Sequence, residues 1–229
     1  MPAHAEPLSL RLRSGQTVSA LVLRPPKPRG CLVLAHGAGA GMHHPFMASL
    51  AEALSGRGIA TLRFQFPFME SGGKRPDRAD VAQEAVREAV AEAARHFPAL
   101  PLFAGGKSFG GRMASQAQAE RPMPGVAGLV FVGFPLHPAG KPGTERAVHL
   151  RDVRTPMLFL QGDRDALADI ALLQATTASL GDAATLHVVT GADHAFHVPA
   201  RSGRTQSEVM QELADRMAHW MGSIDLPQR

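Results

Sequence analysis

Leu102-Phe103-Ala104-Gly105-Gly106-Lys107-Ser108-Phe109-Gly110-Gly111-Arg112 carries the strongest structural signal in this chain. It contains Gly-x-Ser-x-Gly at Gly106, Ser108 and Gly110, with a short apolar run before it and an alanine-rich helical stretch after it. That context predicts a strand, a sharp turn with the serine at its tip, and then a helix. The flanking glycines leave room for the backbone to fold back on itself. We therefore expect a serine hydroxyl beside the free N–H groups of a helix start.

Strand and helix signals alternate on both sides of this turn. Helical patterns separate the predicted strands, which are short apolar runs at Cys31–Ala35, Ile59–Phe64, Leu102–Ala104, Gly128–Val132, Pro156–Leu160 and Thr185–Val189. Such alternation implies an α/β fold with a mainly parallel central sheet and helices on both of its faces. Two further runs, Leu8–Arg13 and Val18–Leu23, predict an N-terminal antiparallel hairpin.

Three helices can be bounded from the sequence. One covers roughly Pro45–Ser55, and Asp77 is expected to cap a second that reaches about Phe97. Thr205-Gln206-Ser207-Glu208 is a capping box that opens the last one. The residues expected on the buried faces are Val81, Ala85, Ala89 and Ala93 in the second helix, and Val209, Leu213, Met217 and Trp220 in the last.

Composition limits the class of protein. With 229 residues, 45% of them hydrophobic, we expect one domain over residues 1–229 with a sizeable core. No apolar run reaches transmembrane length, and Met1–Gln16 has no continuous apolar stretch, so we expect neither a membrane partner nor a secretory signal. The single cysteine, Cys31, is expected in the core and suits a cytoplasmic location. The net charge of +4 comes without a basic run, so we expect no nucleic-acid partner.

A carboxylate and an imidazole follow two of the predicted strands downstream of the serine. Asp163 and Asp165 come just after one strand, and His194 comes a few residues after the last one. The carboxyl ends of the strands in an open α/β sheet meet where such proteins place their active site. Serine, carboxylate and histidine in this chain order are typical of acyl-transfer enzymes in which the serine sits on a strand-to-helix turn.

These residue types suit nucleophilic catalysis. An imidazole can take the proton from a serine hydroxyl, and a carboxylate can orient that imidazole. We therefore expect Ser108 to be the nucleophile and His194 the base. The backbone N–H of Phe109, directly after the serine, is expected to be one donor of an oxyanion hole. Either Asp163 or Asp165 can supply the carboxylate.

The chain resembles the α/β-hydrolase superfamily, in particular its small, lidless, dienelactone-hydrolase-like members. The resemblance runs from about Cys31 to Trp220 and rests on three motifs at the ends of three predicted strands. Gly-Gly-Lys-Ser-Phe-Gly-Gly-Arg-Met and Ala-His-Gly-Ala-Gly are similar to a little-characterised branch, which is related to a hydrolase-like domain of a chromatin-complex subunit. That branch brings no known substrate.

The resemblance implies roles for particular residues. The acid of such proteins usually stands in a Gly-x-x-Asp pattern, which selects Asp165 and leaves Asp163 as a turn residue. The second oxyanion donor is implied to be the N–H of Ala38, with Gly39 as the alternative. Independently of the resemblance, Asp193 is a further candidate acid, but adjacent side chains in an extended loop point apart, so Asp193 beside His194 is expected to be structural. The link from Val132 to Pro156 is too short for a large cap.

Three other interpretations are weaker. His194-x-x-His197 together with His36, His43 and His44 follows no zinc-site spacing, so we expect no metal, and nothing implies a cofactor. Gly-Lys-Ser also ends a nucleotide-binding loop, but that loop needs glycine where Pro101 stands. A non-catalytic interaction module on the same fold is the remaining alternative, because fold alone does not establish function.

The expected function is that of a serine hydrolase, which cleaves an ester or related acyl bond of a small to medium substrate through an acyl-enzyme. The sequence leaves the oligomeric state open. Lys74, Arg75 and Arg78 either attract an acidic substrate or form a solvated face. A second group of residues either lines an apolar pocket or covers the core, and comprises Gln65 to Met69, Met42, Phe46, Phe134 and Leu136.

Overall fold

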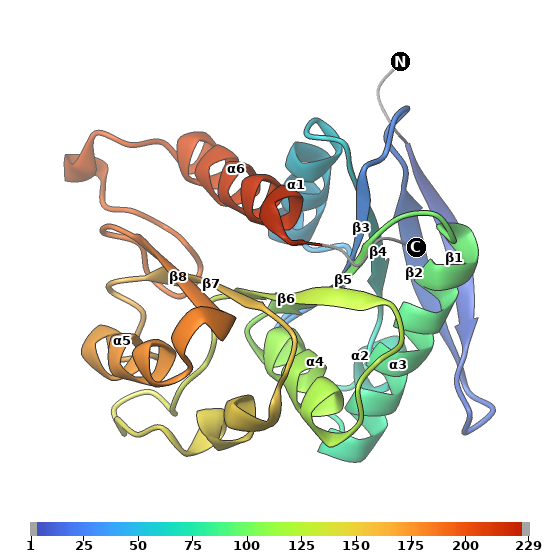
Figure 1. Cartoon of the computed structure of the whole chain (residues 1–229), viewed down its shortest axis with the longest axis horizontal. Coiled ribbons are helices and arrows are strands. Elements are labelled where there is room, and N and C mark those ends of the chain that lie inside the picture. Colours follow the sequence, from blue (N-terminus) through green and yellow to red (C-terminus); the bar gives the residue numbers. More distant parts are fainter. Residues whose placement is uncertain (1–3, 226–229) are drawn as a thin grey trace.

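An eight-stranded sheet organises the computed structural model, which describes residues 4–225 (Figure 1). Its strand order is β1-β2-β4-β3-β5-β6-β7-β8. The strands are β1 (Ala5–Arg11), β2 (Thr17–Leu23), β3 (Gly30–Ala35), β4 (Ile59–Phe64), β5 (Leu102–Lys107), β6 (Val126–Val132), β7 (Met157–Gly162) and β8 (Ala184–Val189). Pairing is antiparallel from β1 to β2 and from β2 to β4, and parallel from β4 through to β8. The predicted fold class and its N-terminal hairpin are confirmed.

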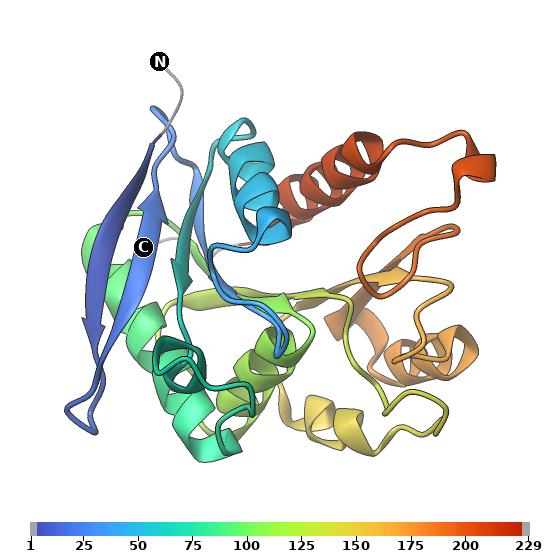
Figure 2. The same cartoon turned by 180° about the vertical axis from the view of Figure 1, so that it is seen from behind.

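Helices cover both faces of this sheet (Figures 1 and 2). α1 (Pro45–Ser55) and α6 (Gln206–Ser223) pack together on one face. The other face carries α2 (Pro67–Glu70), α3 (Ala79–His96), α4 (Phe109–Glu120) and α5 (Ile170–Ser179). Three short 3₁₀ segments complete the fold, η1 (Glu145–Asp152), η2 (Gly181–Ala183) and η3 (Ala200–Ser202).

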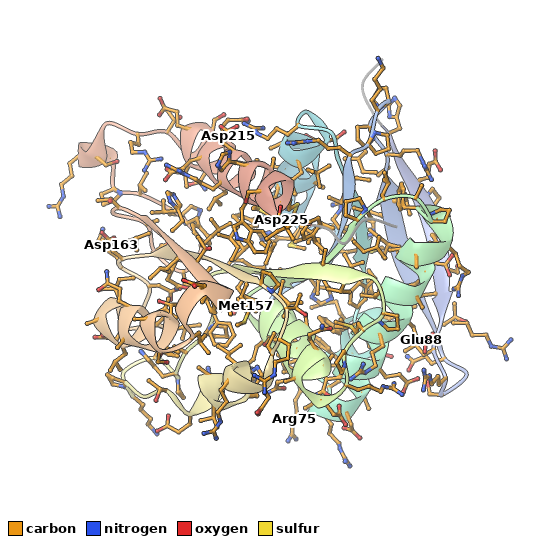
Figure 3. The ribbon with its side chains drawn as sticks, viewed as in Figure 1. Arg75, Glu88, Met157, Asp163, Asp215 and Asp225 are labelled. Carbon is orange, nitrogen blue, oxygen red and sulfur yellow. The ribbon has the colours of Figure 1, made fainter. Side chains whose placement is uncertain are left out.

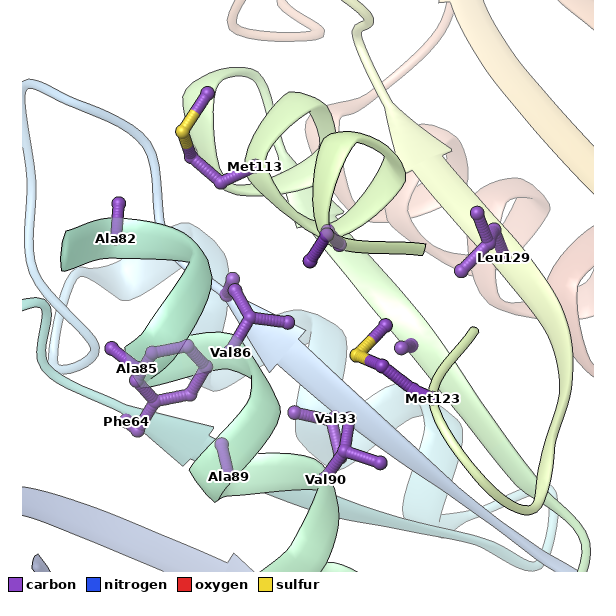
Figure 4. Close-up of a cluster of buried hydrophobic side chains, with 14 of the residues drawn as sticks. Val33, Phe64, Ala82, Ala85, Val86, Ala89, Val90, Met113, Met123 and Leu129 are labelled. Atoms are coloured by element: carbon purple, nitrogen blue, oxygen red, sulfur yellow. The ribbon is translucent and has the colours of Figure 1, made fainter. Parts of the chain in front are cut away.

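The central strands are apolar throughout because both of their faces are covered. Side chains alternate across β3, so that Cys31 and Val33 join the core cluster under α3 and α4, whereas Leu32 and Leu34 join the cluster under α1 and α6. Figure 4 shows part of the first cluster, in which alanines of α3 let that helix approach the sheet closely. Cys31 is buried there, as predicted, and burial raises the pKa of its thiol to about 12.

Several predicted details hold and others were wrong. The helix at Pro45–Ser55 and the capping box between Thr205 and Glu208 are confirmed. Asp77 is not a helix cap: α3 starts at Ala79, and the Asp77 carboxylate instead accepts the N–H of Phe68 at 3.0 Å. Ala85, Ala89 and Ala93 are buried in α3 as predicted, whereas Val81 is only partly buried. The buried face is wider than predicted, because Ala82, Val86 and Val90 also belong to it.

Short elements occupy two of the predicted loops. α2 forms within the loop after β4, and η1 lies in the link that was expected to hold no large cap. η1 packs against α4, on the sheet face opposite α1 and α6. Within residues 4–225, no helix has the length and apolar character to cross a membrane. The single domain over residues 1–229 and the cytoplasmic location stay predictions.

Candidate active site

The serine turn lies between β5 and α4. Ser108 has φ 50° and ψ −114°, a strained conformation for a residue with a side chain. The flanking glycines are required by close contacts. A Cβ on Gly106 would lie 2.1 Å from the carbonyl oxygen of Ala35, and one on Gly110 would lie 2.6 Å from that same oxygen. Strand β3 therefore runs directly beside the turn, which leaves no room for any larger residue at these two positions.

The structure brings three of the predicted residues into one hydrogen-bonded row. Oγ of Ser108 lies 2.9 Å from Nε2 of His194, and Nδ1 of His194 lies 2.7 Å from Oδ2 of Asp165. An ionised carboxylate can only accept hydrogen bonds, so Nδ1 carries the proton and Nε2 is free to accept from the serine hydroxyl. The Asp165 side chain is fully buried, whereas 28% of the His194 side chain is exposed.

The carboxylate of Asp165 is held on all sides. Oδ2 also accepts from Nε2 of Gln161 at 2.6 Å, and Oδ1 accepts the N–H of Leu167 at 2.7 Å. Asp163 points elsewhere and accepts the N–H of Gly191 at 2.7 Å. The sequence analysis missed Gln161, because its side chain meets Asp165 only once β7 and the following turn are folded.

The loop that carries His194 is organised by its neighbour Asp193. Oδ1 of Asp193 accepts the N–H groups of Ala195 and His197, both at 2.9 Å, and its backbone N–H donates to the carbonyl of His197. Phe196 anchors the same loop: its ring is fully buried, and its φ is 63°. Asp193 and His197 thus shape the loop rather than contact Ser108.

The loop after β3 lies against the serine turn. A Cβ on Gly37 would lie 3.8 Å from that of Ser108. His36 fixes the start of this loop, because its Nε2 accepts the N–H of Phe66 at 3.0 Å and its Nδ1 donates to the carbonyl of Gly37 at 2.7 Å. Burial lowers the pKa of His36, which keeps the imidazole neutral and able to accept.

Two side chains from β4 and the residue after it hold the far end of the same loop. Arg63 donates to the carbonyl of Met42 at 3.0 Å, and Oε1 of Gln65 accepts the N–H of Met42 at 2.8 Å. The backbone N–H and carbonyl of Met42 are therefore both hydrogen-bonded to side chains. Phe109 is the first residue of α4, so its N–H is one of the donors that a helix start leaves free.

A cavity of about 1090 Å³ opens beside Ser108. Its lining includes the loop residues Ala38 and Gly39 as well as His194. From there it extends between α1 and α6 as far as Arg57. Arg57 is fixed by Nε donating to Asp215 at 2.6 Å.

Most of the residues that the sequence left open between an apolar pocket and the core lie in the core. Phe46 lines the cavity, but Phe66 and Leu136 are fully buried. Arg75 is not part of the lining either: it lies across the sheet from Asp215 of α6 (Figure 3). The described residues contain no group of three or more histidine, cysteine or acidic side chains placed to hold a metal ion.

Comparison with known proteins places this geometry in a family. A family model described as an alpha/beta hydrolase domain matches residues 28–222. Two Mycobacterium tuberculosis proteins, whose name refers to a phosphoribosyl transferase, are 32% identical over 179 residues, or 76% of this chain. The chain spans 38% of the length of these curated relatives.

Solved structures share the fold over nearly the whole chain. A dienelactone hydrolase from Anabaena variabilis has a TM-score of 0.77 at 20% identity, covering 98% of this chain and 99% of its own. A serine hydrolase without a lid from Xanthomonas campestris has a TM-score of 0.71 at 23% identity, covering 95% and 96%. The resemblance to small lidless hydrolases is confirmed, and the link to a chromatin-complex subunit stays a prediction. Because the family model spans most of its length, this chain belongs to the alpha/beta hydrolase domain family.

Proposed function

We propose that this protein is a serine hydrolase that cleaves an ester or related acyl bond through an acyl-enzyme. The observation that carries the proposal is the row from Ser108 through His194 to Asp165, with 2.9 Å and 2.7 Å between the paired atoms. A strained serine at a helix start, next to a large cavity, supports the same reading. No step of this reaction calls for a cofactor.

In the proposed mechanism Oγ of Ser108 attacks the substrate carbonyl while Nε2 of His194 takes the hydroxyl proton. Asp165 holds the imidazole in the productive tautomer and stabilises its charged form. The backbone N–H groups of Ala38 and Phe109 stabilise the tetrahedral oxyanion, and the start of α4 adds its dipole. His194 then protonates the leaving group, and water hydrolyses the acyl-enzyme through the same groups.

The cavity sets the proposed size of the substrate. Most of its lining residues on α1 and just beyond it are three or four positions apart and so form one face of the helix: Pro45, Phe46, Ser49, Glu52, Ala53, Gly56 and Arg57. Met47 lines the cavity beside this face. At about 1.5 Å per residue this face is roughly 18 Å long from Pro45 to Arg57. Phe46, whose ring lies 5.9 Å from Nζ of Lys107, makes the end near Ser108 apolar, and Met210 adds a further apolar side chain to the lining. Such a lining suits an acyl chain of short to medium length.

Labelling with a fluorophosphonate probe, followed by assays with p-nitrophenyl esters of increasing chain length, tests this proposal. The wild type should be labelled at Ser108 and should hydrolyse the shorter esters. Ser108→Ala should lose both properties while it stays folded, whereas the exposed Ser179→Ala should keep both. An unlabelled wild type that is inert to the whole ester panel would favour the non-catalytic interaction module.

A further inference from the structure

Lys107 stands between the first glycine and the serine of the turn, and its side chain enters the candidate site. It is the last residue of β5 and lies on the same strand face as Phe103, so it points toward α1 and α6. Its Nζ donates to the backbone carbonyl oxygen of His194 at 2.5 Å. The residue next to the nucleophile is thus bonded directly to the main chain of the base.

Aromatic rings and a glycine build a compartment around this ammonium. Nζ lies 5.4 Å from the centroid of the Phe196 ring and 5.9 Å from that of Phe46. Both distances are within the range of cation–π attraction. A Cβ on Gly133, at the end of β6, would lie 3.0 Å from Nζ and 3.5 Å from the His194 ring. Only glycine there leaves normal space for both side chains.

The charge of Lys107 is held in a poorly solvated place. Burial lowers the pKa of its amine to about 8, and the carboxylates of Asp165 and Asp193 partly oppose that shift. The groups that face the amine are Asp165 after β7, Asp193 and His194 after β8, and an uncharged ring of α1. An ordinary surface lysine would stay charged to far higher pH.

We propose that Lys107 is a positioning residue for His194: its ammonium ties the loop after the edge strand β8 to β5, and so keeps the imidazole aligned with Ser108. This inference rests on the proposed hydrolase function. A hydrogen bond from a charged donor is roughly twice as strong as one from a neutral donor. When the Lys107 ammonium loses its proton, its hydrogen bond to the His194 carbonyl weakens and its attraction to the rings of Phe46 and Phe196 is lost. In alkaline solution the His194 imidazole is therefore less well aligned with Ser108.

The alkaline side of the rate profile tests this inference without any variant. The group is charged below its lowered pKa, so kcat of the wild type should hold up to about pH 8 and fall above it. Fluorophosphonate labelling should slow over the same interval. A kcat and a labelling rate that stay constant to pH 10 would overturn the proposal.

Two substitutions separate the tie from mere packing. Lys107→Met keeps an apolar stem between the rings but cannot donate, and Lys107→Gln keeps a neutral donor. Lys107→Met should lower kcat about 10- to 100-fold with KM changed less than about threefold, as expected for a misaligned base. Lys107→Gln should retain more activity, and neither variant should show the decline near pH 8. Lys141→Met, at an exposed lysine, is the matched control.

Each remaining outcome has a defined meaning. A Lys107→Met enzyme with wild-type kcat, or with the wild-type alkaline decline, would refute the positioning role. A rise in KM at constant kcat would refute it as well, since it would make Lys107 a substrate contact. Failure of the proposed function looks different, because then even the wild type would not be labelled at Ser108.

Discussion

Separate substitution of Asp163 and Asp165 by asparagine distinguishes the roles of these two residues most sharply. Asp165 is surrounded by three donors, from His194, Gln161 and Leu167. In Asp165→Asn an NH₂ group replaces Oδ2 and must itself find acceptors. Gln161 can turn its amide, because its buried Oε1 has no hydrogen-bond partner in the described part of the chain. The new NH₂ group then donates to Nδ1 of His194, so Nδ1 must be unprotonated and the imidazole proton moves to Nε2. A protonated Nε2 cannot take the proton of the Ser108 hydroxyl.

The size of this effect follows from the tautomer change. A histidine held in the wrong tautomer costs a loss on the order of 10⁴-fold in kcat, or about 5.4 kcal/mol of transition-state stabilisation. Asp163→Asn is the control: it keeps the oxygen that accepts the N–H of Gly191, so kcat should change less than about threefold. The assay is kcat and KM with p-nitrophenyl butyrate, with melting curves to show that both variants fold. A greater loss in Asp163→Asn, or a loss under tenfold in Asp165→Asn, would refute the assignment.

Four further outcomes are expected. Gly106→Ala places a Cβ 2.1 Å from the Ala35 carbonyl oxygen, so urea denaturation should show a loss of about 3 kcal/mol or more, and a loss under 1 kcal/mol would contradict the close contact. Ala53→Phe should narrow the cavity between α1 and α6 and so lower the ratio of kcat/KM for octanoate to that for acetate esters. Ala48→Leu lies outside the cavity lining and should leave this ratio unchanged. Equal ratios in both variants would refute binding of the acyl chain in this cavity. Burial lowers the pKa of His149 to about 4, so between pH 6.5 and 4 the unfolded chain binds a proton at this residue and the folded chain does not. The free energy of unfolding should therefore fall as the pH drops from 6.5 toward 4. His149→Gln should remove this contribution to the pH dependence. Without a lid, the rate on butyrate should exceed that on palmitate and should not jump at the micellar concentration; a jump there would reveal a lipid-gated site.

Local chemistry decided which features the sequence could predict. The serine turn depends on two glycines and a strand-to-helix change within a few residues, and the capping box needs only Thr205 and Glu208. Short-range signals of this kind are present in the linear chain. The sheet class followed from alternation, because buried parallel strands must be apolar on both faces.

Long-range packing decided the features that were missed. Asp77 looks like a helix cap in the sequence, but its carboxylate serves the N–H of Phe68, which only the folded loop brings near. Lys107 was not recognised for the same reason, because it hydrogen-bonds to His194, which follows a different strand. Gln161 lies only four residues before Asp165, but its side chain meets the carboxylate only when the turn after β7 is folded. Phe66 could not be assigned to pocket or core, since both environments favour the same apolar side chain.

The position of β8 at the edge of the sheet makes the part of the site that follows β8 less stable against local unfolding than the part that follows β5. Among residues 4–225, β8 pairs with a strand on one side only and stays partly exposed, yet the loop that follows it carries His194. Ser108 instead follows β5, a strand paired on both sides in the middle of the sheet. Edge segments open at lower free-energy cost than central ones. Mild heat or denaturant should therefore abolish catalytic activity while the circular dichroism spectrum is still that of the native protein. On cooling, activity should return as fast as β8 can pair with β7 again.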